Sequence, residues 1–404
     1  MSAAVTRIPR SLFSRRWIPA LALMSAVVFA GCSDSGGGDD GADLVAAFTV
    51  IGQAAFDSGS PNRGGAASAA TLAQPLGNVA TDGTRLFIAD TANNRVLGYA
   101  RVPVANGAAA DLVLGQDDFG GTAAGTAQNR MALPASVFIG GGRLVVADSG
   151  NNRVLIWNTI PATSGELPDV VVGQADFTTG GSGTSQTQLA FPTSAIIANG
   201  RLIVADQNNN RVLVWNAVPT DNGTPADLVL GQRDFVSRIA DDEADEMNRP
   251  AAVWSDGFRL LVADSGNHRV LYWSLFPNES GAEADYVIGQ SGFSRSSPGT
   301  SSSTLRTPFG VSSDGTRIYV ADSGNNRVLE FDAFPIANGV AASAVFGQEK
   351  NNFSAATAND DDQDGTADDR PSARTLSGAT GAFVYSGVLY VTDRNNHRVL
   401  MFPQ

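Results

Sequence analysis

Residues 146–157 have the sequence VADSGNNRVLIW, in which two apolar runs flank the polar segment SGNN. Ser, Gly and Asn are turn formers, so the stretch predicts two strands joined by a tight hairpin. Its central pattern, Asp-x-x-Asn-(Asn/His)-Arg-Val-Leu, occurs six times. The Asp and Arg of the six copies are Asp90 and Arg95, Asp148 and Arg153, Asp206 and Arg211, Asp264 and Arg269, Asp322 and Arg327, and Asp393 and Arg398. The interval between copies is constant from Asp90 to Asp322 and longer before Asp393, which indicates a repeat architecture.

Each repeat unit contains four short segments with the composition of β-strands. In the second unit these are residues 136–139, 143–148, 153–157 and 169–173. Gly, Asn or Pro lies between successive segments and marks a turn. Four strands per unit are typical of a propeller blade, and there is no apolar period of about 3.6 residues such as helical solenoids have.

The positions of the motifs predict how the ring closes. A second motif, Gly-Gln followed by Phe, also occurs six times, with its glycines at positions 52, 115, 173, 231, 289 and 347. Residues 48–53 match the fourth strand of a unit, whereas residues 398–402 match a third strand at the end of the chain. Pairing them satisfies the backbone of both. We therefore predict an all-β, six-bladed propeller of four-stranded blades over residues 46–404, closed by the N-terminal strand.

Three copies of the motif carry a family resemblance. Residues 146–157, residues 204–215 (VADQNNNRVLVW) and residues 320–331 (VADSGNNRVLEF) resemble the NHL repeat, whose blades have a similar Asp…Asn…Arg turn. The resemblance covers residues 46–404 and implies a propeller. It implies no particular activity, because one fold serves many functions.

The six Asp–Arg pairs have two interpretations. They could form a charged ring that binds a ligand, or they could stabilise each hairpin across its two strands. We favour the structural role because the pair is identical in all six units. The aromatic residues four positions after each Arg are predicted to pack between blades, and they are Tyr99, Trp157, Trp215, Trp273, Phe331 and Phe402.

Residues 1–31 are predicted to be a lipoprotein signal peptide. Four arginines precede the apolar run 18–30, which suits a signal-peptide core and is short for a membrane span. The run ends in Phe-Ala-Gly-Cys and resembles a bacterial lipobox, which implies that Cys32 is the lipid anchor. The alternative is an ordinary cleaved signal followed by an incidental cysteine.

The segment after Cys32 predicts the location of the mature protein. Residues 32–45 are rich in Gly, Ser and Asp and are predicted to be a flexible tether. Ser33 after the cysteine implies, by resemblance to lipoprotein sorting, the outer membrane of a bacterial cell envelope. Export by the general or the twin-arginine route stays open.

The sequence contains no recognisable catalytic constellation, and we assign no catalytic residue. His268 and His397 are the only histidines, and both occupy a turn position that is Asn in the other four units. A zinc or copper site built from histidines is therefore not expected. No Gly-x-Ser-x-Gly nucleophile elbow is present.

One acidic segment has the spacing of a calcium loop. Asp360, Asp362, Asp364 and Asp368 alternate with other residues around Gly365 and resemble the calcium loops of EF-hands and thrombospondin type 3 repeats. The terminal Glu of an EF-hand is missing. The alternatives are a weak calcium site and a solvated acidic loop. A second acidic run, residues 241–246, lacks the alternation and is interpreted as solvent-facing.

We expect a lipid-anchored binding or scaffolding module. The connectors at residues 120–133, 178–191 and 236–249 share a length but little sequence, and in a propeller they emerge on the same face as the hairpins. A protein or carbohydrate partner is predicted on that face. The formal net charge of −13 argues against nucleic acid as a partner. The alternatives are a hydrolase or lyase with a calcium-assisted site at the central channel, and a purely structural surface protein.

Overall fold

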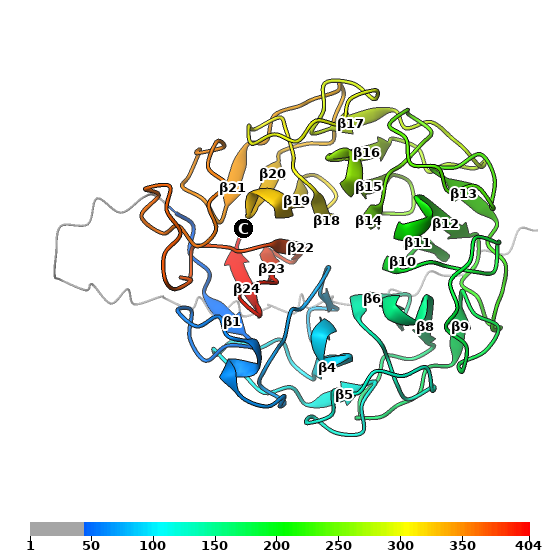
Figure 1. Cartoon of the computed structure of the whole chain (residues 1–404), viewed down its shortest axis with the longest axis horizontal. Helices are drawn as coiled ribbons and strands as arrows, with labels where there is room; N and C mark the ends of the chain where they lie inside the picture. Colours follow the sequence, from blue (N-terminus) through cyan, green and yellow to red (C-terminus); the bar gives the residue numbers. More distant parts are fainter. Residues whose placement is uncertain (1–43) are drawn as a thin grey trace, which may run out of the picture. The chain divides into compact units, whose positions relative to one another are not determined.

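The computed structural model describes residues 44–404 and contains six four-stranded antiparallel sheets, arranged as blades in a ring (Figure 1). This confirms the predicted six-bladed all-β propeller. In each blade the innermost strand comes first in the chain order, and the outermost comes last. The exception is blade six, whose outermost strand comes from the N-terminal end of the described chain.

The strands of blades one to three have the following bounds: β2 (Ala80–Thr81), β3 (Leu86–Asp90), β4 (Arg95–Tyr99) and β5 (Leu112–Leu114); β6 (Pro134–Gly140), β7 (Arg143–Asp148), β8 (Arg153–Trp157) and β9 (Val170–Val172); β10 (Pro192–Ala198), β11 (Arg201–Asp206), β12 (Arg211–Trp215) and β13 (Leu228–Leu230). Blades four to six contain β14 (Pro250–Ser255), β15 (Leu260–Asp264), β16 (Arg269–Trp273) and β17 (Tyr286–Ile288); β18 (Pro308–Ser313), β19 (Ile318–Asp322), β20 (Arg327–Phe331) and β21 (Ala344–Phe346); β22 (Ala379–Tyr385), β23 (Val388–Asp393), β24 (Arg398–Pro403) and β1 (Thr49–Ile51).

Short 3-10 turns complete the secondary structure. One, η1 (Pro61–Gly64), lies in the first connector. The others form the hairpins between the second and third strands: η2 (Thr91–Asn93), η3 (Ser149–Asn151), η4 (Gln207–Asn209), η5 (Ser265–Asn267) and η6 (Ser323–Asn325). Each of these five hairpins ends on a left-handed residue, such as Asn152 with φ of 52°. Asn tolerates this conformation better than most residues, which explains its place in the motif.

The ring closes as the sequence predicts. The blue strand β1 lies beside the red strand β24 in Figure 1, and Val50 pairs with Leu400. Val50 and Ile51 are fully buried, so the closing strand contributes apolar contacts as well as ladder hydrogen bonds. Two segments separated by almost the whole described chain therefore share one sheet.

The core lies between neighbouring blades. Trp157 of blade two packs with Phe87 and Leu112 of blade one in a single apolar cluster. Its indole N–H donates to the carbonyl of Glu166 at 2.9 Å, which satisfies the one polar atom of the side chain. The aromatic residue at this position thus packs between blades.

The predicted signal peptide, residues 1–31, the anchor Cys32 and most of the predicted tether, residues 32–45, lie outside the described residues. Within residues 44–404, no helix has the length and apolar character needed to span a lipid bilayer.

Candidate functional site

The hairpin of each blade is built around a buried carboxylate. In blade two, Asp148 accepts hydrogen bonds from the Arg153 Nε at 2.7 Å, the Asn151 side-chain amide at 2.8 Å and the backbone N–H of Ala132 at 2.7 Å. Asp148 and Arg153 are both fully buried. Burial raises the pKa of the Asp148 carboxyl, and the charge of Arg153 opposes that rise. The pair is therefore not exposed to a ligand. It belongs to the buried part of the blade that holds the hairpin, which we call the frame.

The arginine of the pair also reaches the connectors. Arg153 donates to the carbonyl oxygens of Thr126 at 2.7 Å and Arg130 at 2.9 Å, in the connector before its blade, and to that of Phe177 at 2.6 Å, after it. The guanidinium group has five donors in a fixed planar fork, so one side chain can hold two connectors.

The same arrangement occurs in all six blades. Every motif Asp and Arg is fully buried, and every pair has an Nε–carboxylate distance of 2.7–2.8 Å: Asp90–Arg95, Asp148–Arg153, Asp206–Arg211, Asp264–Arg269, Asp322–Arg327 and Asp393–Arg398. In blade six, Arg398 donates to Phe56, Ser372 and Thr375, so it joins the two ends of the ring.

The Gly-Gln motif has a role that the sequence analysis did not identify. Gln174 donates to the carbonyls of Asn152 and Gly181, both at 2.9 Å, which ties the hairpin to the next connector. Gly173 has φ of +88°, and a Cβ there would lie 2.5 Å from the Leu189 side chain. Leu189 is the buried apolar side chain of its connector, with an exposed fraction of 0%, and we call the residue at this position the plug. The sequence carries a signal for these buried connector residues, because Met131, Leu189, Met247 and Leu305 recur at the same constant interval as the hairpin motif.

The two histidines are turn residues, as their positions indicate. His268 is left-handed with φ of 55°, and its Nδ1 accepts the backbone N–H of Thr307 at 2.9 Å. Asn152 does the same with its side-chain oxygen, toward Phe191. His397 accepts the N–H of Gln74. Burial lowers the pKa of both imidazoles below the ordinary value of 6.5, which favours the neutral form that these bonds require.

The hairpins and the connectors lie on one face, which we call the connector face. Asn94, in the first hairpin, donates to the carbonyl of Thr122 and accepts from the backbone of Leu133, and both partners belong to one connector. Outward side chains of the connectors are exposed and differ from blade to blade. Val236 and Ile239 have exposed fractions of 67% and 68%, whereas Thr178 and Ser182 are exposed polar residues.

A cavity of about 250 Å³ occupies the central channel. Its walls come from the first strand of the blades and include Phe138, Trp254, Phe383 and Tyr385, together with several Ser and Thr hydroxyls. Among the residues that line this cavity there is no carboxylate, histidine, lysine or arginine. Its chemistry therefore suits an uncharged, largely apolar group.

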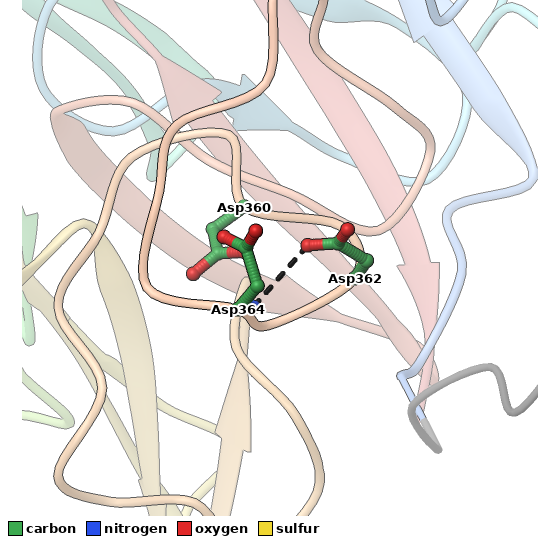
Figure 2. A group of neighbouring side chains, drawn as sticks. All are labelled: Asp360, Asp362 and Asp364. Atoms are coloured by element: carbon green, nitrogen blue, oxygen red, sulfur yellow. Dashed lines mark hydrogen bonds between the residues drawn. The ribbon is translucent and has the colours of Figure 1, made fainter.

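Three of the four predicted calcium ligands come together. Asp360, Asp362 and Asp364 each place a carboxylate oxygen within 4.8 Å of the other two (Figure 2). Asp368 does not belong to this group, and its carboxylate accepts the backbone N–H of Asp361 at 2.8 Å. Burial raises the pKa of the Asp360 carboxyl, and the charges of Asp364 and Asp362 add to the rise.

On the face opposite the connectors, Phe258 and Leu275 are exposed apolar side chains that sequence reasoning did not identify. Phe258 and Leu275 belong to blade four, and Leu275 has an exposed fraction of 79%. The neighbouring Arg259 places its guanidinium 3.7 Å from the ring centre of Phe334 in blade five. These residues come from separate turns, two in blade four and one in blade five, so no linear motif marks them.

No protein-family model and no curated protein matches this chain. Solved structures to which it is similar include the WD40 β-propeller domain of Doa1, with 10% identity, 90% of this chain and 94% of that chain covered, and a TM-score of 0.43. Virginiamycin B lyase from Staphylococcus aureus has 10% identity, covering 82% and 95%, with a TM-score of 0.42. A chain of the nidogen/laminin complex has 16% identity, covering 64% and 76%, with a TM-score of 0.37. Such values carry no argument about function, and the fold rests on the sheet topology.

Proposed function

We propose that this chain is an extracytoplasmic, lipid-anchored propeller that acts as a binding or scaffolding module for a protein or carbohydrate partner on the connector face. The proposal includes membership of the NHL repeat family, which the six Asp…Asn…Arg turns support. Anchoring through Cys32, at the outer membrane of a bacterial envelope, is supported by the sequence from Met1 to Ser33.

One observation carries the proposed binding surface. The arginine and glutamine side chains that hold the connectors bind backbone carbonyls, as Arg153 does at Thr126 and Gln174 does at Gly181. A carbonyl is present whatever the side chain. The exposed residues of a connector can therefore change without loss of its position, which is what a binding scaffold requires.

The alternative, a hydrolase or lyase with a calcium-assisted site in the channel, is not supported by a specific contact. Such an enzyme needs carboxylates or amides that converge on a metal at the channel. The cavity is lined by one amide, that of Asn78, and by no carboxylate, and the three clustered aspartates are not among its lining residues.

The anchor has a direct test. Cys32→Ala removes the only thiol in the chain. We expect the variant to move from the membrane fraction to the soluble extracytoplasmic fraction, because stable attachment depends on the acyl chains. A variant that stays in the membrane fraction would show that Cys32 is not the anchor.

The binding surface is tested with an affinity pull-down from envelope extract, using the Cys32→Ala protein as bait. A second bait changes only outward residues of three connectors, such as Thr122, Thr178 and Val236, to Gly or Ser. The plugs Met131 and Leu189 are kept because they are buried. We expect the second bait to lose the partner while melting at the same temperature. Retention of the partner by the second bait would refute the connector face as its site.

A further inference from the structure

The connector between β21 and β22 contains a buried carboxylate oxygen without a partner. Asp360 has an exposed fraction of only 2%, and its Oδ2 accepts the backbone N–H of Gly365 at 3.0 Å. Its Oδ1 is buried and has no hydrogen-bond partner. A buried oxygen of this kind is costly unless a donor or a cation satisfies it.

Two further carboxylates lie close to the Asp360 carboxylate. Asp362 and Asp364 approach Asp360 from the same loop, and the three side chains gather inside its curve (Figure 2). The arginines of the connector are engaged elsewhere, since Arg374 pairs with Asp361 at 2.7 Å and Arg370 with Asp57 at 3.3 Å. Three negative groups at this separation repel one another until a cation joins them.

We propose that this connector binds one calcium ion through Asp360, Asp362 and Asp364. All three offer oxygen, the ligand that hard cations prefer, and the cluster has no thiolate or imidazole to favour zinc or copper. Calcium accepts six to eight oxygens in flexible geometry, so backbone carbonyls and water complete the shell of an exposed loop. Asp368 is excluded from the set, which distinguishes this site from the four-ligand pattern of the sequence.

The position of the loop indicates what the ion does. Asn359, next to Asp360, exchanges two hydrogen bonds with Asn396 in the hairpin of blade six, at 3.1 and 2.8 Å. The Gln363 side chain accepts the backbone N–H of Glu349 at 3.0 Å. Bound calcium therefore orders a loop that contacts the closing blade. Since the folded loop binds the ion and the unfolded chain does not hold the site, calcium raises the melting temperature.

Calorimetric titration of the full-length protein with calcium chloride tests the proposal. We expect one saturable site with a dissociation constant on the order of 10⁻⁴ to 10⁻³ M, the range of extracellular modules. Asp362→Asn/Asp364→Asn should weaken binding by about tenfold or more, because it removes two of three charged ligands. Both residues are exposed, so this variant should fold, and its calcium-free melting temperature should equal or exceed that of the wild type because two of the three mutually repelling charges are gone.

Asp242→Asn/Asp245→Asn is the matched control, because it removes the same charge from the unalternating acidic run of another connector. It should bind calcium as the wild type does, and calcium should raise its melting temperature equally. The proposal is overturned by absence of a saturable site at millimolar calcium, by unchanged binding in the Asp362/Asp364 variant, or by equal loss in the control. The test does not involve the partner, so its failure is distinct from failure of the connector face.

Discussion

The hairpin and the connector of one blade differ in what their side chains contact. Asp148 and Arg153 of the hairpin are fully buried and bind one another and backbone groups. In the connector at residues 178–191, Thr178 and Ser182 face solvent, and the plug Leu189 is buried. The hairpin side chains thus hold the connector backbone in place, and the outward side chains of the connector can vary without changing that position.

Removal of the closing strand should break this frame most severely. Deletion of residues 46–56 removes Val50 and Ile51, each worth about 1.5–3 kcal/mol of burial, and the carbonyl of Phe56 that Arg398 binds. We expect loss of cooperative melting or a fall of more than about 3 kcal/mol in the free energy of unfolding, measured with urea.

The matched control moves the strand instead of deleting it. Residues 46–56 are appended after Gln404 through a linker copied from residues 100–111, which join the same two strands in blade one. Recovery of the wild-type stability is expected. Unchanged stability after the simple deletion would contradict closure by β1.

A single buried pair should have the next largest effect. Arg153→Ala leaves Asp148 as an uncompensated buried charge and frees carbonyls of two connectors, so we expect a loss of about 3–5 kcal/mol in the free energy of unfolding. Thr178→Ala, on the connector side of the comparison, should change it by less than about 0.5 kcal/mol. Equal losses of stability for Arg153→Ala and Thr178→Ala in urea denaturation would show that the hairpin pair and the outward connector side chains contribute alike to stability.

The histidine turns should give the smallest effect, and its sign follows from their pKa values. The folded-state pKa of His268 and His397 lies below 6.5, the ordinary value, so the unfolded chain takes up protons first as the pH falls. Their contribution is complete above about pH 6.5 and is lost below it. His268→Asn/His397→Asn copies the other four turns and should flatten the decline in melting temperature from about pH 7 to about pH 5. An unchanged decline would exclude the histidines as its cause.

The parts of the fold that could be predicted are those that repeat. Six copies of one hairpin predict the strands, the number of blades and the closure of the ring, because each copy must occupy an equivalent position in the fold. The role of Gln174 could not be predicted, since its partners are carbonyls whose positions depend on the path of the connector. The spacing of the aspartates predicted a cluster of four, and the structure brings three of them together, because the path of the loop leaves Asp368 outside the group. The exposed Phe258 and Leu275 come from separate turns and have no local signature in the sequence.

The most direct test of the connector face compares the affinity of the captured partner for two double variants. Val236→Ser/Ile239→Ser changes the connector face, and Phe258→Ser/Leu275→Ser changes the opposite face. All four residues are exposed, so both variants should fold as the wild type does. We predict that the first weakens binding by about tenfold or more, which is about 1.4 kcal/mol, and that the second changes it by less than about twofold. The reverse result, loss of binding only in the Phe258/Leu275 variant, would contradict the account.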